Sequence, residues 1–400
     1  LVFLVWSGGS GGGLWDVTNT ANWDGGSQLF SNFDNVVFDD TGAGAVNVGV
    51  TVQPSSVVFS NSAVNYALAG AGKISGFTGL AKFGSGMLAI NSAKHDFTGP
   101  VIINGGTLAV GSVALNGNAS ALGAGTNITL NGGIFQFGGA KPAASSFNRY
   151  WTLGANGGTI LSTNGVFFIP NQISGPGSLT VTGAVQLILG DTIAGVLTNA
   201  NNSYLGNTYV TEYELQIRTA HALGYGKAVV SSNADLAVAG GGSYGTVTND
   251  IDLYGGDGKG SACTLQVNDA GTAVNFGGTI DLLAGSSVGT LNNGLAVASF
   301  TISGPIIGPG SLKKLGTNAV SLMSAGNTYS GGTLIASGTL QRGAVAACGS
   351  LGSGAVTNNG TRAYNHSDSV TNNSPISGAG KLTQTGAGAP AAYAGRFIIA

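Results

Sequence analysis

The chain is 400 residues long, with 71 glycines, only 8% charged residues and a formal net charge of −2. Globular proteins average about 7% glycine and about 25% charged residues. Nucleic-acid binding is excluded, because it needs clustered lysine and arginine to displace counterions. Disorder is excluded because 43% of the residues are hydrophobic and strong charge is missing. No run of 18 apolar residues occurs, so the sequence predicts no transmembrane segment.

The first segment, residues 1–60, is expected to form an N-terminal cap and the first coils. It contains Trp6, Trp15 and Trp23. An open end of stacked strands is an exposed edge that invites association, and three indole rings can cover it. The alternative is that these rings form a sugar-stacking or subunit-docking surface.

An internal repeat dominates the rest of the chain. Residues 80–108 and 312–340 align without a gap. The matched pairs include Leu80/Leu312, Lys82/Lys314, Gly84/Gly316, Phe97/Tyr329 and Gly99/Gly331. In this alignment His95 stands where the second copy has Asn327. We expect the recurring aromatic residue, which is Tyr204 in a more divergent third copy, to pack in the core.

The copies define the domain organisation. Phrases of the type Ile-Ser-Gly-Pro-Gly-Ser-Leu precede three of them, and a phrase of the type Ala-Leu-Gly-x-Gly follows three. We therefore expect residues 61–400 to form one continuous solenoid. Its repeat units lie near 68–140, 173–240 and 302–360, with a partial unit from 376 that departs from the pattern at Pro390.

The pattern inside each copy predicts strands. Apolar residues alternate over runs of four to six residues, and Gly-Gly, Asn-Gly and Ser-Gly turns separate the runs. Units this short cannot close a core alone, so they must stack. The sequence predicts an all-β fold, a parallel β-helix (β-solenoid) in the form of an elongated rod. A series of antiparallel sandwiches is the alternative. The irregular spacing does not support a propeller, which needs blades of about 40–50 residues.

The phrase L-x-K-x-G, then N-x-Y-x-G, then G-T-L resembles the autotransporter-associated β-strand repeat. It is clearest at Leu312–Gly316, Asn327–Gly331 and Gly338–Leu340. The resemblance implies a right-handed parallel β-helix, export from the cell and a surface or extracellular role. It implies no catalytic residues.

Few side chains suggest chemistry, and we assign no catalytic, cofactor-binding or metal residues. The histidines His95, His221 and His366 lie far apart, and no zinc motif occurs. The carboxylates that could serve an acid–base pair or calcium are Asp39, Asp40, Asp250, Asp252 and Asp257, with Asp250 and Asp252 on one face of a strand. No aromatic or basic residues cluster with them. Whether Cys263 and Cys348 pair is left open.

These observations predict a non-enzymatic, secreted structural or surface protein. It would be a β-solenoid subunit of a fibre, sheath or surface layer, and low charge leaves head-to-tail self-assembly open. The alternative is an adhesin or glycan-binding passenger, and a polysaccharide lyase or glycosidase ranks below both. Self-association and a glycan or cell surface are the expected partners.

Overall fold

The structure of the protein is a computed structural model. It describes residues 3–140, 148–193, 196–198, 201–256, 263–289, 299–344, 349–367, 371–372, 374–386, 392–393 and 397–398. The chain forms two compact units, Leu1–Gly206 (unit 1) and Asn207–Ala400 (unit 2). The domain boundary expected at residue 60 stays a prediction.

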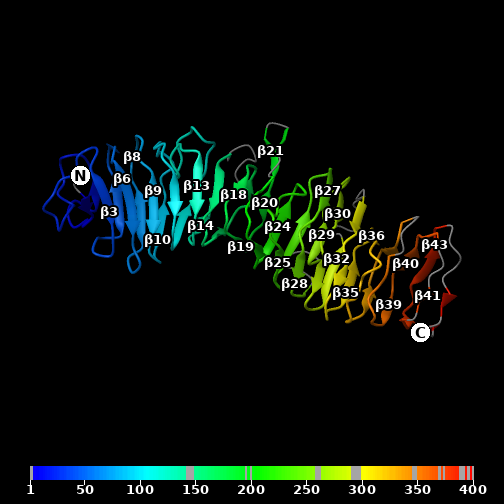
Figure 1. Ribbon diagram of the computed structural model, residues 1–400. Helices are drawn as coiled ribbons and strands as arrows, with labels where there is room; N and C mark the ends of the chain where they lie inside the picture. The colour runs from blue at the N-terminus through cyan, green and yellow to red at the C-terminus, as the bar shows by residue number, and fades with distance from the viewer. Residues whose placement is uncertain are drawn as a thin grey trace. The chain divides into compact units, whose positions relative to one another are not determined.

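Unit 1 consists of parallel sheets whose neighbouring strands come from successive turns of the chain (Figure 1). The first sheet contains β1 (Phe3–Val5), β3 (Asn35–Phe38), β6 (Ser56–Ser60), β9 (Leu80–Phe83), β11 (Val101–Ile103), β13 (Asn127–Leu130), β15 (Tyr150–Leu153) and β18 (Ile173–Ser174). The second contains β2 (Leu14–Trp15), β4 (Ala45–Val48), β7 (Tyr66–Ala69), β10 (Met87–Ile90), β12 (Thr107–Val110), β14 (Ile134–Phe137), β16 (Gly158–Ser162) and β19 (Leu179–Gly183). Two shorter parallel pairs are β5 (Thr51–Val52) with β8 (Lys73–Ile74), and β17 (Phe167–Ile169) with β20 (Leu187–Leu189). The hairpin of β21 (Asp191–Ile193) and β22 (Val196–Thr198) is antiparallel.

Unit 2 is built in the same way. One sheet contains β23 (Thr208–Val210), β25 (Ala228–Val230), β28 (Ile251–Leu253), β31 (Ile280–Leu282) and β34 (Ile306–Ile307). A second contains β24 (Tyr213–Ile217), β26 (Ala234–Val238), β29 (Leu265–Val267), β32 (Ser286–Gly289), β35 (Leu312–Leu315), β37 (Thr333–Ile335), β39 (Val356–Asn358), β42 (Ile376–Ser377) and β45 (Phe397–Ile398). A third contains β27 (Ser243–Val247), β30 (Ala273–Phe276), β33 (Ser299–Ile302), β36 (Ala319–Leu322), β38 (Thr339–Arg342), β40 (Thr361–Tyr364) and β43 (Lys381–Gln384). The last pair is β41 (Thr371–Asn372) with β44 (Ala392–Tyr393).

The register of these sheets defines a β-solenoid. Leu80 pairs with Val101 and Leu312 pairs with Thr333, so at one turn of each unit the chain returns to the same position after 21 residues. Backbone hydrogen bonds therefore run from turn to turn, which satisfies the groups that burial would otherwise leave unpaired. The described residues contain no helix. The prediction of an all-β, parallel solenoid is confirmed.

Alternating side chains fill the interior in columns that follow the register. In the first sheet one column contains Leu4, Val36, Val57, Leu80, Val101, Ile128, Trp151 and Ile173. All eight side chains are buried. Between the strands, glycine takes the corners; Gly76 and Gly175 have φ angles of 91° and 113°, a region that other residues rarely adopt. Apolar alternation therefore places the core, and glycine places the corners.

An aromatic cluster closes the interior of the first turns of unit 1. Trp6, Trp15, Trp23 and Phe30 are fully buried. Neighbouring rings within this cluster have centroids 5.0 to 6.0 Å apart, which is the range of favourable aromatic contacts. The predicted N-terminal cap is thus present as a packed cluster, and its buried indoles offer no surface for sugar stacking.

In the part of the chain that the structure describes, no helix could span a membrane.

Candidate functional site

Both copies of the repeat occupy four strands in the same arrangement. The first copy forms β9 to β12 and the second forms β35 to β38. In each, the third strand pairs with the first and the fourth pairs with the second. One copy therefore covers two adjacent turns, so its motifs hold neighbouring turns together.

The buried lysine of the repeat donates hydrogen bonds to the backbone of a corner. Lys314 Nζ donates hydrogen bonds to the carbonyl oxygens of Leu315, Gly316 and Ser337 at 2.5, 2.8 and 3.2 Å. Lys82 Nζ makes the equivalent bonds to the two carbonyls that follow it. Both side chains are buried, and burial lowers the pKa of each lysine to about 8. These lysines are structural, because their donors are used on the backbone.

The aromatic residue of the repeat packs against the glycine of the phrase that follows it. Phe97, Tyr204 and Tyr329 are buried, as predicted. A Cβ atom at Gly123 would lie 2.7 Å from the Phe97 ring, and one at Gly352 would lie 2.7 Å from the Tyr329 ring and 1.9 Å from its carbonyl oxygen. The Ala-Leu-Gly-x-Gly phrase therefore reflects the close approach of one turn to the ring of the turn before.

His95 accepts the same kind of backbone hydrogen bond as the asparagine at the equivalent position of the other copies. The side chains of Asn202 and Asn327 accept the backbone N–H groups of Ile173 and Ile306, each at 2.7 Å. His95 Nδ1 accepts the N–H of Ile74 at 3.0 Å. The imidazole is fully buried, and burial lowers the pKa of His95 to about 4. The predicted equivalence of His95 and Asn327 is confirmed.

The described aspartates that the sequence suggested accept hydrogen bonds from backbone N–H groups or form an ion pair with lysine. Asp40 accepts the N–H groups of Ser62, Ala63 and Val64 at 2.8 to 2.9 Å, and these bonds lower its pKa. Asp39 Oδ1 accepts the N–H and hydroxyl of Thr41.

In unit 2, Asp250 accepts the N–H of Thr279 at 2.8 Å, and Asp252 forms an ion pair with Lys227 at 3.1 Å. Asp257 and Cys348 lie outside the described residues. Cys263 and His366 are buried and His221 is exposed. Within the described ranges, no three His, Cys, Asp or Glu side chains gather to hold a metal ion.

The sequence did not point to a buried carboxyl pair in unit 2. Glu214 and Asp235 pair across β24 and β26, and both are buried. Gln266 Nε2 lies 3.1 Å from Glu214 Oε2 and 2.5 Å from Asp235 Oδ2. Burial and the nearby charge of Asp235 raise the pKa of Glu214 to about 8. Because both side chains are buried, the pair suits a structural hydrogen-bond network better than acid–base catalysis on a polymer.

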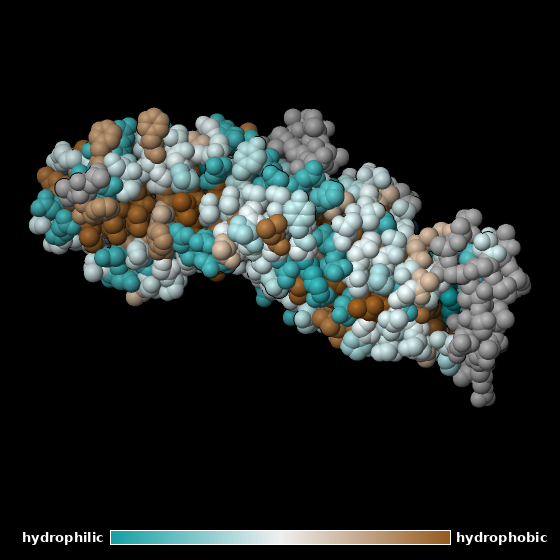
Figure 2. All heavy atoms as spheres, viewed as in Figure 1, coloured by the Kyte–Doolittle hydropathy of each residue, from teal (hydrophilic) through white to brown (hydrophobic). Residues whose placement is uncertain are grey.

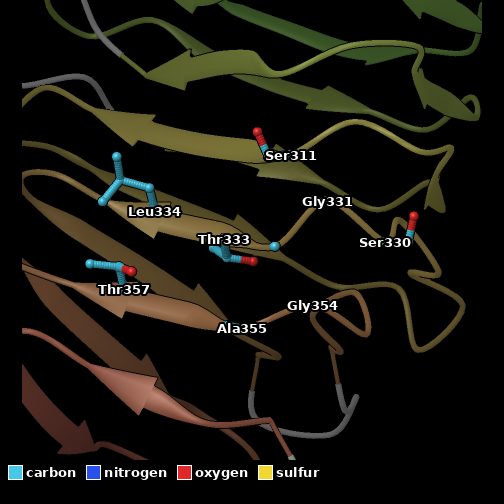
Figure 3. A pocket seen from close by; sticks show the side chains of 9 residues that line it. Ser311, Ser330, Gly331, Thr333, Leu334, Gly354, Ala355 and Thr357 are labelled. Atoms are coloured by element: carbon cyan, nitrogen blue, oxygen red, sulfur yellow. The ribbon is translucent and has the colours of Figure 1, made fainter. Parts of the chain in front are cut away.

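A shallow groove lies at a corner of unit 2, where the chain enters β35, β37 and β39 (Figure 3). It measures about 360 Å³. Its lining consists of small hydroxyl residues, glycine and short apolar residues: Ser311, Ser330, Gly331, Gly332, Thr333, Leu334, Gly354, Ala355 and Thr357. The Thr333 hydroxyl lies 2.7 Å from the hydroxyl of Tyr329 and is therefore engaged. No charged or aromatic side chain lines this groove.

A second groove, of about 420 Å³, lies at a corner of unit 1. It is lined by Phe33, Gln53, Pro54, Ser55, Gly76, Phe77 and Thr78. Two of these residues are phenylalanines on the surface: Phe33 is 71% exposed and Phe77 is 95% exposed. Figure 2 shows hydrophobic residues gathered on unit 1 toward its N-terminus. The sequence analysis did not identify this groove.

Comparison with known proteins supports the repeat. The sequence model of the passenger-associated-transport-repeat family matches residues 80–110 and 312–341. A curated relative, the adhesin BmaC autotransporter of Brucella suis biovar 1 (strain 1330), is 28% identical over 204 residues. The match covers 50% of this chain and 6% of that relative. No solved structure matches the chain. The two matched segments, one in each unit, form the same four-strand arrangement, so the chain carries the passenger-associated transport repeat at residues 80–110 and 312–341.

Proposed function

We propose that the chain is part of a non-enzymatic, adhesin-type passenger that is exported and displayed at the cell surface or released outside the cell. The observation that carries the proposal is the passenger repeat, found in both units and folded in both as a β-solenoid. The partial match to an adhesin supports it. The described motif residues stabilise corners and turns, so they supply a scaffold whose outward faces are left for contact.

Adhesion is tested with beads coated with the purified 400-residue protein. Retention on an epithelial cell layer under flow is compared with that of beads carrying the heat-unfolded protein or albumin. We expect several-fold more beads to be retained with the folded protein. Equal retention of the three kinds of bead would contradict the adhesin role. Release of oligosaccharides from a polysaccharide panel would contradict the non-enzymatic role.

Self-assembly is a separate proposal, favoured by the low net charge, which gives little repulsion between copies. The aromatic cap works against addition at the first turns of unit 1, because its rings already cover the interior there. Analytical ultracentrifugation over a hundredfold range of concentration tests it. Sedimentation that stays monomeric throughout would rule out intrinsic polymerisation.

A further inference from the structure

We propose that the groove between Phe33 and Phe77 binds a neutral glycan, whose sugar rings stack on the two phenylalanines. The proposal rests on the adhesin-type function above and assigns it a site. Phe33, Pro54 and Phe77 occupy equivalent corner positions on three successive turns, because Asn35 pairs with Ser56 and Val57 pairs with Leu80. Pro54 is buried between the two exposed rings. The rings thus stand two turns apart, about 9–10 Å at the spacing of neighbouring strands.

The solenoid itself does not require an aromatic residue at position 77. Gly76, Gly175 and Gly308 form equivalent corners: each has a positive φ, and each carbonyl accepts a backbone N–H of the next turn at 2.9 to 3.0 Å. Gly175 is followed by Pro176, and Gly308 is followed by Pro309. After the corresponding Gly378 the chain has Ala379. A phenylalanine that is 95% exposed at such a corner adds no core packing.

Phe33 carries a second sign of function, backbone strain. Its φ is 76°, in the left-handed region that a bulky residue rarely adopts. The corner is held there by the Phe33 N–H bond to Gln53 O at 2.7 Å and by the Ser55 hydroxyl bond to Phe33 O at 2.6 Å. Residues held in such conformations concentrate at ligand-binding positions. The strain is maintained while the ring itself stays exposed.

The chemistry of the groove selects the class of ligand. Its lining has no charged side chain, so it offers nothing to a sulfated, phosphorylated or nucleic-acid chain, which needs cations. The electron-rich face of an aromatic ring attracts the C–H groups on the apolar face of a pyranose. The Gln53 side chain lies beside Gly76, because a Cβ atom at Gly76 would lie 3.9 Å from Gln53 Cβ and 4.0 Å from Gln53 Cγ. Its amide can donate to and accept from sugar hydroxyls. These features fit a neutral oligosaccharide with at least two linked rings.

The test measures binding of cellohexaose, chitohexaose and laminarihexaose to the full chain by isothermal titration calorimetry and saturation-transfer NMR, with heparin as the charged comparison. The variants are Phe77→Ala, which introduces the residue found at position 379, and Phe33→Asn, which suits a positive φ. Phe83→Ala is the matched control: Phe83 is 41% exposed but lies at the opposite end of β9.

We expect at least one neutral hexasaccharide to bind to the wild-type chain. We expect its affinity to fall tenfold or more in both groove variants and to stay unchanged in the control. We expect Phe33→Asn to melt at the same or a higher temperature, so that weaker binding cannot come from unfolding.

Several outcomes would overturn the proposal. These are no binding of any neutral hexasaccharide at millimolar concentration, preference for heparin, or equal affinity in Phe77→Ala and wild type. A self-association that Phe77→Ala abolishes would instead identify the groove as a contact between copies. If coated beads adhere but the groove variants adhere equally well, the glycan site fails while the adhesin function stands. If no beads adhere, the adhesin function fails whatever the hexasaccharides do.

Discussion

His95 shows, at the scale of one residue, how the repeat can exchange a side chain and keep its hydrogen bond. The asparagine of the other copies accepts a backbone N–H through an amide oxygen, and His95 accepts it through Nδ1. Unlike the amide, the imidazole can be protonated. A proton on Nδ1 would remove the acceptor and leave a charge in a buried site.

This difference predicts an acid-labile turn in unit 1. The unfolded chain binds a proton at His95 with a pKa near 6.5, whereas the folded chain does so only near 4. The free energy of unfolding therefore falls as the pH drops from about 6.5 to about 4, by at most about 3 kcal/mol. Urea unfolding of wild type and His95→Asn at a series of pH values checks this. Equal slopes against pH in the two proteins would contradict it.

Glu214 predicts the opposite sign in unit 2. Its pKa is raised by burial and by Asp235, so the folded chain holds a proton that the unfolded chain releases near pH 4.5. Stability from this site is complete below about pH 4.5 and is lost as the pH rises toward about 8. Glu214→Gln should flatten this dependence. Glu212→Gln, at an exposed glutamate two residues earlier, is the matched control and should leave it unchanged.

At the scale of the strand and its corner, Lys314 links the end of β35 to the next turn. Replacing it by methionine keeps the apolar stem but leaves the carbonyls of Leu315, Gly316 and Ser337 without their donor. We expect a loss on the order of 3 kcal/mol in the free energy of unfolding. Lys313→Met, on the outward face of the same strand, should change it by less than about 1 kcal/mol. Denaturant unfolding of both variants measures the difference, and similar losses would show that Lys314 has no special role.

The same scale shows what the sequence can and cannot predict. Alternation and turn glycines are local signals, and they predicted the strands and their corners. The gap-free repeat predicted the stacking of turns, the buried aromatics and the equivalence of His95 with Asn327. They do not reveal when a strand is covered on both faces. All five residues of β26 are buried, and the outward-facing Asp235 and Glu214 would have been expected in solvent.

The groove of unit 1 could not be predicted for a related reason. Phe77 interrupts the phrase that introduces the other copies, so Ile74–Leu80 did not stand out as its equivalent. Phe33 precedes the repeated segment, and its alignment with Phe77 depends on the strand register of the first three turns. Only the folded chain places the two rings on one surface.

At the scale of the whole molecule, each unit contains strands of parallel sheets and columns of buried side chains. Stability in such solenoids comes mainly from contacts between neighbouring turns. The effects of His95 and Glu214 should therefore remain confined to the unit that contains each residue, and opposite signs of pH dependence should separate the two units in an unfolding experiment.

The aromatic cap supplies the means to observe this separation. All four tryptophans of the chain, Trp6, Trp15, Trp23 and Trp151, belong to unit 1. Indole emission is therefore a built-in optical reporter of unit 1, and unit 2 is silent at that wavelength. We expect the far-ultraviolet circular dichroism, which detects strands in both units, to contain a second transition without a counterpart in fluorescence. The loss of stability at His95 as the pH falls should appear in the emission. The loss at Glu214 as the pH rises from about 4.5 to about 8 should appear only in the dichroism.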